Sequence, residues 1–370
     1  MIKVLHIING LERGGAEKML FKYNYFSKNN DKIRNITLSL TKKNFLNDRS
    51  EILDEVETYE LDLKSLNLFR SFKVINAIKK KHKINIVQGW MYHGNIFAFF
   101  IKKIFFPKAK IFFNVRHALY NFKYENIRNI ISINIGKYVS KYVDKIIYNS
   151  NVAKKHHENI GYSKFNGIVI RNGFLKINNK TNSDKKLFPW LIKKNTIVIA
   201  KIARFHKIKA YEIFLKACEV IDKKFEIQIV CIGNGTEHKQ FRNLLNNFSF
   251  RNNPLTLGEV FYPEIYLNDI DLLINSSYAE SMPNIIGEAF LHGSFCIASD
   301  VGDTSLYFPN KQFLFKPGDH NLLVKKIEDF INLPDFEKVS IIKKSEINLL
   351  ENYSLKKVCN NYNKNYGVTS

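Results

Sequence analysis

Two glutamates in the C-terminal half are spaced so that both could bind one ligand. Glu280 and Glu288 are eight positions apart and follow the apolar run Leu272–Asn275. This order of residue types predicts a buried strand, a loop that holds Glu280, and a helix with Glu288 about one turn from its start. Backbone N–H groups at the start of such a helix suit a diphosphate, and both carboxylates can accept hydrogen bonds from sugar hydroxyls.

The ends of this helix are predicted from its terminal residues. Ser281 is a suitable N-cap, and Pro283 suits the first turn because its missing N–H would have no partner there. Gly293 suits the C-terminal end, where a left-handed residue often follows the last turn. The loop and the first turn are therefore expected to face the ligand.

A second group of charged residues follows the first predicted strand of the C-terminal half. Arg204 and Lys209 lie in the segment 202–209, together with His206 and Lys207. A guanidinium and an ammonium aimed at a diphosphate would stabilise the negative charge that develops as its bond to a sugar breaks. Each charge-assisted hydrogen bond contributes about 1.5–3 kcal/mol. A basic surface without a specific function would also account for these residues.

Taken together, these segments resemble family four of the retaining glycosyltransferases. The resemblance rests on the Glu-x7-Glu pattern of Glu280 and Glu288, the Arg-x4-Lys pattern of Arg204 and Lys209, and the trailing segment 298–303. It extends from residue 2 to about residue 307 and is strongest from residue 202 onward. It implies a GT-B fold and transfer of a sugar from a nucleotide-diphosphate donor with retention of configuration.

The resemblance also implies roles for individual residues. Glu280 would contact the donor sugar, Glu288 the ribose, and Arg204 and Lys209 the diphosphate. Further donor-site positions implied by the resemblance are Pro283, Asn284, Ile285, Gly233, Gly258 and Val260. Ala203 stands where the family usually has glycine, which leaves the tightness of that loop open. The family is described by front-face transfer, so no carboxylate nucleophile is expected.

The N-terminal half has a glycine-rich turn and two histidines after predicted strands. Gly14 and Gly15 precede a predicted helix and allow the backbone to approach the reacting groups closely. A Gly-Gly turn is common before helices, and this one lacks the G-x-G-x-x-G pattern of dinucleotide-binding proteins. The family often has a histidine near the position of His117, which is therefore expected to act in catalysis. His93 is expected on the acceptor side with the two glycines.

The whole chain alternates short apolar runs with longer amphipathic segments, which is typical of parallel α/β sheets. The predicted strands are 3–8, 36–40, 84–88, 111–115, 145–149, 167–171, 196–200, 226–232 and 272–275, and the clearest helices are 17–26, 71–81 and 211–221. We expect two doubly wound, Rossmann-like domains that face an interdomain cleft. The predicted boundaries are an N-terminal domain at 1–175, a linker at 176–195, a C-terminal domain at 196–350, and a helix or tail at 351–370 that could pack back on the first domain.

Composition limits the partners. The 370 residues carry a net charge of +23, which indicates attraction to nucleic acid, anionic lipid or phosphorylated substrates, although a generally lysine-rich surface explains it equally well. Nucleic acid is not expected, because helix-turn-helix, RNP-like and zinc-finger patterns are absent from the sequence. The expected partners are a UDP-, GDP- or ADP-type sugar and a saccharide or polyprenyl-diphosphate-linked acceptor, in the assembly of a bacterial surface polysaccharide.

Location is predicted from the N-terminus, the cysteines and one apolar segment. The first ten residues read as a strand rather than a signal peptide, and no apolar stretch reaches the ~20 residues of a spanning helix. Four cysteines without CxxC spacing suit reduced core thiols, so a cytoplasmic protein is expected. Segment 95–110 is apolar with lysines at one end, and could rest on the inner face of a membrane or form a buried helix.

No metal or other cofactor is expected. Asp269 and Asp271 run directly into the strand Leu272–Asn275, which does not suit a metal site. Other enzymes on the same scaffold, such as a sugar-nucleotide epimerase or a phosphorylase, remain compatible with the fold. Release of nucleoside diphosphate only in the presence of an acceptor would distinguish a transferase from both.

Overall fold

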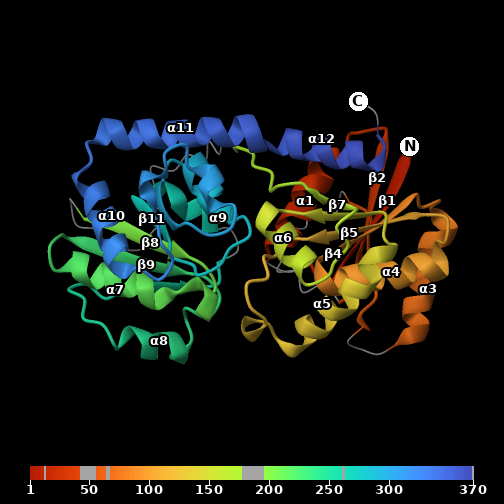
Figure 1. Cartoon of the computed structure of the whole chain (residues 1–370), viewed down its shortest axis with the longest axis horizontal. Coiled ribbons are helices and arrows are strands. Elements are labelled where there is room, and N and C mark those ends of the chain that lie inside the picture. Colours follow the sequence, from red (N-terminus) through yellow and green to blue (C-terminus); the bar gives the residue numbers. More distant parts are fainter. Residues whose placement is uncertain (12–13, 42–55, 64–66, 177–195, 261–262, 369–370) are drawn as a thin grey trace. The chain divides into compact units, whose positions relative to one another are not determined.

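The computed structural model describes residues 1–11, 14–41, 56–63, 67–176, 196–260 and 263–368. They form two compact units, of which the first comprises residues 1–173 with 353–370 and the second residues 174–352. Each unit contains one parallel sheet with helices packed against it (Figure 1). The linker predicted at 176–195 lies, apart from Lys176, outside the described residues.

The first unit is built on a seven-stranded sheet in the order β3-β2-β1-β4-β5-β6-β7, with every neighbouring pair parallel. Its strands are β1 (Ile2–Ile8), β2 (Ile33–Ser39), β3 (Thr58–Glu60), β4 (Ile86–Trp90), β5 (Lys110–Val115), β6 (Lys145–Tyr148) and β7 (Gly167–Val169). Its helices are α1 (Gly15–Ser27), α3 (Leu68–Lys81), α4 (Met91–Phe105), α5 (Ile127–Val139), α6 (Asn151–Asn159) and α12 (Leu355–Tyr366). The winding reverses between β1 and β4, so ligands are expected at the carboxyl ends of these two strands.

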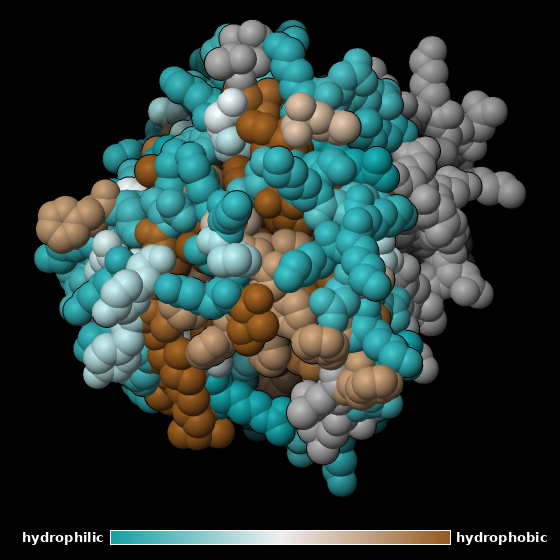
Figure 2. Space-filling view, turned by 90° about the vertical axis from the view of Figure 1, so that its right-hand side faces the viewer, coloured by the Kyte–Doolittle hydropathy of each residue, from teal (hydrophilic) through white to brown (hydrophobic). Residues whose placement is uncertain are grey.

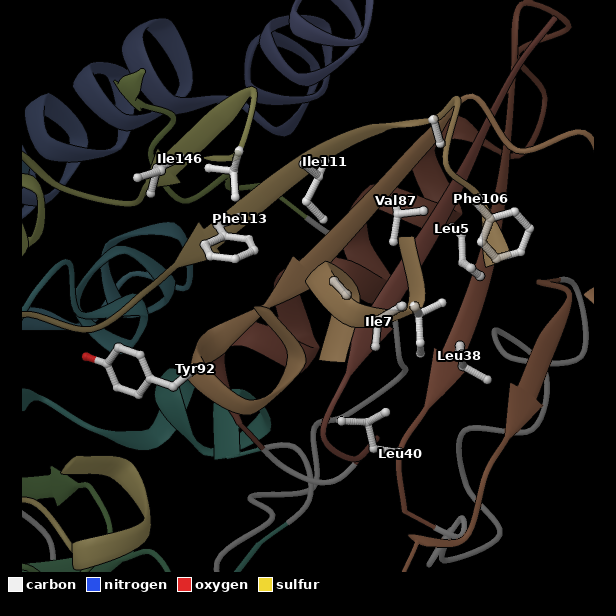
Figure 3. Close-up of a cluster of buried hydrophobic side chains, with 14 of the residues drawn as sticks. Leu5, Ile7, Leu38, Leu40, Val87, Tyr92, Phe106, Ile111, Phe113 and Ile146 are labelled. Carbon is white, nitrogen blue, oxygen red and sulfur yellow. The ribbon is translucent and has the colours of Figure 1, made fainter. Parts of the chain in front are cut away.

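Alternation along the strands explains why helices cover both faces of this sheet. Leu5 and Ile7 belong to one core cluster, whereas Val4 and Ile8 belong to another. The first cluster, part of which is shown in Figure 3, also includes residues of α3, α4, α5 and α6. The second includes residues of α1 and α12. Because both faces are apolar, the strands can be buried on both sides, as parallel strands usually are.

The C-terminal helix α12 completes the second face next to α1. Its two buried tyrosines pack in the core while their hydroxyls reach polar partners. Tyr362 Oη accepts a hydrogen bond from Asn114 Nδ2 at 2.8 Å, and Tyr366 Oη donates to Gln88 Oε1 at 2.6 Å. These contacts join α12 to β5 and β4, so the end of the chain is part of the first unit.

The second unit is built on a six-stranded sheet in the order β10-β9-β8-β11-β12-β13, and all its pairs are parallel. Its strands are β8 (Ile197–Ile202), β9 (Ile227–Ile232), β10 (Leu255–Gly258), β11 (Leu272–Asn275), β12 (Phe295–Ser299) and β13 (Leu314–Phe315). Its helices are α7 (Tyr211–Asp222), α8 (Lys239–Leu245), α9 (Asn284–Leu291), α10 (His320–Asn332) and α11 (Asp335–Tyr353), whose last residue belongs to the first unit. Here the winding reverses between β8 and β11.

The predicted α/β class with two Rossmann-like sheets is confirmed. Some strand limits were wrong: β2 begins three residues before the predicted 36–40, because Ile33 to Asn35 pair with the start of β1. β4 begins at Ile86 and extends to Trp90, and β7 ends at Val169 rather than 171. The strands β3, β10, β12 and β13 were not predicted.

Two features bear on the predicted location. In the part of the chain that the structure describes, no helix has the length and apolarity needed to cross a membrane. The four cysteines are all buried and unpaired, as predicted.

Candidate active site

The predicted donor-site residues gather at the carboxyl edge of the second sheet. β8 and β11 are neighbours, and their loops carry the charged residues. The loop after β8 holds Arg204 and Lys209, and the loop after β11 holds Glu280. Because parallel strands end at the same edge, two segments about 70 positions apart in sequence meet where the winding reverses.

Lys209 and Glu280 form an ion pair at this point. Lys209 Nζ donates to Glu280 Oε1 at 2.6 Å. The same oxygen accepts hydrogen bonds from Ser277 Oγ at 2.7 Å and from Asn275 Nδ2 at 3.4 Å. Among the described residues, the second oxygen, Oε2, has no hydrogen-bond partner. Glu280 is thus fixed through one oxygen and retains the other as an acceptor.

The surroundings of Glu280 favour its charged form. Burial raises the pKa of this carboxyl, but the charge of Lys209 and the hydrogen bonds from Lys209, Ser277 and Asn275 together lower it more. The pKa of Glu280 is therefore below its ordinary value. At neutral pH the group is a carboxylate, which accepts hydrogen bonds and does not donate a proton.

Backbone contacts hold the two charged loops together. The N–H of Tyr278 donates to the carbonyl of Ile208 at 2.8 Å, which joins the loop after β11 to the loop after β8. Gly302, at φ +62, lies against the other side of the Glu280 loop, where an added Cβ would be 2.2 Å from the Glu280 carbonyl oxygen. The N–H of Asp303 donates to the carbonyl of Ser281 at 2.8 Å. The position of Glu280 therefore depends on the loops after three strands.

Unlike Lys209, Arg204 is not engaged in an ion pair among the described residues and can bind a ligand. It is exposed, and the described part of the chain offers it neither a hydrogen bond nor an ion pair. Its loop is anchored by Ala203, whose N–H donates to the carbonyl of Ile232 at 2.8 Å. Gly233 lies so close to this loop that an added Cβ would be 2.1 Å from the Ala203 oxygen. Ala203, which replaces the expected glycine, is thus accommodated, and the close approach is made by Gly233.

The helix after the Glu280 loop begins two residues later than the predicted cap at Ser281 implies. Pro283 is the N-cap of α9, because its ψ of 116° is extended, so it lies before the first turn and Ser281 is not the cap. Asn284 is the first helical residue, and Gly293 at φ +85 follows the C-cap as predicted. Glu288 is buried one turn into the helix.

The remaining predicted donor residues lie at the helix start and at the end of β10. Asn284 and Ile285 are half-buried. Gly258 ends β10 at φ +65, and its N–H donates a hydrogen bond to Thr236 Oγ1 at 3.1 Å. Val260 is half-buried just beyond it. All of these residues follow or end strands of one sheet, so they are at its carboxyl edge with Glu280.

In the first unit, the predicted acceptor residues follow β1 and β4. Gly14 is the N-cap of α1 and Gly15 its first residue. The carboxylate of Glu17 lies over Gly14, where an added Cβ would be 2.0 Å from its Oε2. His93 is half-buried near the start of α4, and burial, with a smaller contribution from Arg128, lowers the pKa of its imidazole.

His117 follows β5 and belongs to a chain of polar side chains. Tyr92 Oη lies 3.2 Å from His117 Nδ1 and 2.9 Å from His157 Nε2. His157 Nδ1 lies 2.8 Å from the carbonyl of Ala153, and His117 Nε2 lies 3.4 Å from Glu125 Oε1. Helices α4 and α6 and the loop that holds Glu125 thus contribute to the surroundings of His117.

The hydrogen bonds among His157, Tyr92 and His117 determine which way the His117 ring faces. Burial lowers the pKa of His157 to about 4, so this ring is neutral, and its Nδ1 must donate because a carbonyl only accepts. His157 Nε2 therefore accepts from the Tyr92 hydroxyl. Tyr92 can then accept only from His117 Nδ1, which leaves His117 Nε2 facing the carboxylate of Glu125. The ring of His117 is thus oriented with Nδ1 toward Tyr92 and Nε2 toward Glu125.

Four residues near these sites had no role predicted from the sequence. Tyr92, His157 and Glu125 surround His117, and Lys201 is buried in β8 beneath the Lys209–Glu280 pair. Lys201 interrupts the apolar run of its strand, which is a signal that the sequence does provide. The contacts of Tyr92 and Glu125 join positions 8 to 65 apart and have no local signal.

The acidic side chains and histidines bear on whether a metal ion could bind. Across the described ranges, no group of three or more His, Cys, Asp or Glu side chains is arranged to hold a metal ion. Asp271 Oδ2 accepts a hydrogen bond from the N–H of Val198 at 2.8 Å, so this carboxylate joins the starts of β11 and β8.

Comparisons with known proteins agree with this arrangement. The architecture is that of GT-B glycosyltransferases: the structure of Anabaena HepE in complex with UDP-glucose superposes with a TM-score of 0.79, with 16% sequence identity and all of both chains covered. Sucrose-phosphate synthase from Thermosynechococcus elongatus gives a TM-score of 0.80, with 13% identity over 99% of this chain and 98% of that one.

The sequence comparisons narrow the class. Residues 182–346, which include both charged loops, match the family model described as glycosyl transferases group 1. The capsular polysaccharide biosynthesis glycosyltransferase CapH of Staphylococcus aureus is 26% identical, and the alignment covers 85% of this chain and 86% of CapH. These findings support a group 1 glycosyltransferase with the GT-B fold.

Proposed function

We propose that this protein is a retaining glycosyltransferase that transfers a sugar from a nucleotide-diphosphate sugar to a saccharide acceptor. The observation that carries the proposal is the contact of Lys209 with Glu280 at the edge of the second sheet, on loops that also present an unpaired Arg204. The relatives support it, since HepE was crystallised with UDP-glucose and CapH is a capsular polysaccharide enzyme.

Each residue has a task that follows from its charge and contacts. Arg204 and Lys209 bind the diphosphate and stabilise the charge it gains as the bond between the anomeric carbon and the phosphate oxygen breaks. Glu280 Oε2 accepts a hydrogen bond from a hydroxyl of the donor sugar, and Glu288 binds the ribose. The acceptor oxygen forms its bond on the face that the phosphate leaves, and its proton goes to that phosphate. His117 orients the transferring sugar.

The acceptor in this proposal is a lipid-linked saccharide of a bacterial surface polysaccharide. Support comes from the printed role of CapH in capsular polysaccharide biosynthesis. The net charge of +23 also suits an acceptor that carries a diphosphate.

The reaction is tested by following donor and product together. We expect nucleoside diphosphate to be released from a UDP-, GDP- or ADP-sugar only when a saccharide acceptor is present. The new linkage should have the anomeric configuration of the donor, measured by NMR of the product. EDTA should leave the rate unchanged, because Arg204 and Lys209 supply the charge that a metal would. An inverted product would contradict the retaining mechanism, and loss of activity in EDTA would contradict metal independence.

We further propose that the first unit contacts an anionic membrane through an apolar patch on α3 and α4. Phe69 and Phe72 on α3 and Phe97, Phe100 and Ile104 on α4 are exposed. Figure 2 shows apolar side chains gathered among hydrophilic ones on the face that carries these helices. The other face of α4, with Ala98, Ile101 and Phe105, is buried. Of the two interpretations of segment 95–110, the buried helix therefore describes one face of α4, and a surface that could rest on a membrane describes the other.

Basic residues on the same two helices suit anionic lipid. The last turn of α3 carries Lys79, Lys80 and Lys81, and that of α4 carries Lys102 and Lys103. Each basic residue near an anionic surface contributes about 1 kcal/mol, so several together with the apolar side chains are needed for attachment.

Vesicle binding tests this surface with a matched control. The double variant Phe69→Ser/Ile104→Ser should bind phosphatidylglycerol-containing vesicles about 10–100-fold more weakly than wild type. Full burial of one such side chain contributes about 1.5–3 kcal/mol, and these two gain only part of it because part of their surface is already covered in the protein. Phe336→Ser/Val339→Ser on α11 is the control, since Phe336 is 73% exposed and Phe69 70%. Equal binding by both variants, or equal binding of wild type to pure phosphatidylcholine, would exclude the proposed contact.

A further inference from the structure

Lys201 is a buried lysine that the proposed mechanism does not use. It lies in β8 with 1% of its surface exposed, and its ammonium group lies 5.1 Å from the ring centre of Tyr211 and 5.8 Å from that of Phe214. Its one hydrogen bond within the described residues runs from Nζ to Ser276 Oγ at 2.8 Å. A buried lysine with a single acceptor is costly to keep charged, so its retention calls for an explanation.

The contact with Ser276 connects Lys201 to both charged loops. Ser276 Oγ donates to the carbonyl of Ala210 at 3.0 Å, and Ala210 directly follows Lys209. Ser276 also stands between Asn275 and Ser277, which both donate to Glu280 Oε1. The series Lys201, Ser276 and Ala210 therefore lies under the place where the two loops meet.

The charges around Lys201 are those of the donor site. Burial is the main reason that the pKa of Lys201 falls to about 7, and the nearby positive charge of Lys209 lowers it further. Glu280 has the opposite, smaller effect, as do the thiols of Cys231 on β9 and Cys218 on α7. At neutral pH the amine is thus balanced between its neutral and charged forms, and an added negative charge nearby would favour the charged one.

We propose that Lys201 is a positioning residue for the donor site: through Ser276 it holds the Lys209 and Glu280 loops together, and it takes up a proton when the diphosphate of the donor binds. This inference rests on the proposed function. The diphosphate of the donor places two negative charges next to Lys209. These charges favour the protonated form of the buried Lys201 amine, which then adds a positive charge to the site. Lys209 is then less dependent on Glu280 as its counter-ion and can bind the phosphate.

The test is the number of protons taken up on donor binding. Wild-type protein is titrated calorimetrically at pH 7.5 with UDP-glucose, GDP-mannose and ADP-glucose in buffers of different ionisation enthalpy, and the tightest binder is used further. These diphosphates have no group that titrates near neutral pH, unlike a free nucleoside diphosphate. If donor binding raises the proton affinity of Lys201 about tenfold, about half a proton is taken up per molecule at pH 7.5. The affinity for the donor then rises about sevenfold from pH 8.5 to pH 6.0.

Two variants separate the two parts of the proposal. Lys201→Met should still bind the donor, more weakly, and without this proton uptake or pH dependence. Ser276→Ala keeps the amine, so uptake should persist while affinity falls because the link between the loops is lost. His206, in the same loop, is present in all three proteins, so only the difference between them reports on Lys201.

The outcomes are distinct from those that test the function. Proton uptake that persists in Lys201→Met, or unchanged affinity in both variants, would overturn the role of Lys201 while leaving the glycosyltransferase proposal intact. Should Lys201→Met fail to fold, as judged by circular dichroism, full affinity in Ser276→Ala would overturn the link by itself. Failure of wild type to bind any of the three donors would overturn both proposals.

Discussion

Replacing Lys209 by alanine is expected to lower kcat by about 10²–10³-fold, the effect typical of removing one group that stabilises developing negative charge. Glu280→Gln should act in the same range, because it removes the carboxylate that contacts the sugar and leaves Lys209 without its counter-ion. Both variants should fold, since the backbone hydrogen bonds from Tyr278 to Ile208 and from Asp303 to Ser281 still hold the loops. Steady-state kinetics with saturating donor measure the effect.

A second ion pair of the same unit provides the control. Lys224 Nζ lies 2.7 Å from Glu328 Oε1, but the pair is exposed and far from the strand ends that carry the site. Lys224→Ala and Glu328→Gln should retain wild-type kcat. If the Lys209 and Glu280 variants turn over as fast as these controls, the pair has no part in the reaction.

The Lys209–Glu280 pair should also make the stability of the protein depend on pH. Because the pKa of Glu280 is lowered in the folded protein, its contribution to the free energy of unfolding is present above the pKa of the unfolded carboxyl. It is lost as pH falls through the lower pKa of the folded state. The stability difference between wild type and Glu280→Gln should therefore shrink on acidification.

Gly302→Ala is expected to have the second large effect. The added Cβ would lie 2.2 Å from the Glu280 carbonyl oxygen and 2.6 Å from that of Ser281, and the residue has φ +62. The loop that carries Glu280 must then move, so kcat/KM should fall by about 10²-fold, as expected for a displacement of about 1 Å in an active site. The free energy of unfolding should fall by about 1–3 kcal/mol.

A variant at Gly293 is the control that distinguishes the effect of backbone strain from that of loop displacement. It also has positive φ, at +85, but an added Cβ there meets nothing within 4 Å. Gly293→Ala should cost about 1–2 kcal/mol for the left-handed conformation and leave kcat/KM unchanged. Urea unfolding measures the stability of both variants. Equal losses of kcat/KM in Gly302→Ala and Gly293→Ala would show that the position of Glu280 does not depend on Gly302.

Sequence patterns over a few residues predicted the helices and strands that depend on interactions over a few residues. The apolar run Leu272–Asn275 followed by Pro283 and Gly293 predicted a strand and a helix, because burial and backbone restrictions act over a few residues. The helix start was misplaced by two residues, since only the extended ψ of Pro283 shows that this residue lies before the first turn. Short edge strands such as β3 and β13 depend on pairing with a distant neighbour and have no comparable pattern.

The site itself was predicted only in part. The charges of Glu280, Arg204 and Lys209 were evident from residue type and spacing, but their pairing depends on β8 and β11 being neighbours. Two contacts could not be predicted from the sequence. The orientation of His117 depends on Tyr92 from another element, and the hydrogen bond from Lys201 to Ser276 depends on β8 and β11 being neighbours.

Direct binding of a donor tests the central claim, which is that the second unit holds a nucleotide-diphosphate sugar through Arg204 and Lys209. Calorimetric titration of UDP-glucose, GDP-mannose and ADP-glucose into wild type and Arg204→Ala/Lys209→Ala would measure it. We predict that wild type binds at least one donor and that the double variant binds it about 10²-fold more weakly or worse, from the loss of two charge-assisted hydrogen bonds. Equal affinity of the two proteins, or no binding of any donor to wild type, would contradict the account.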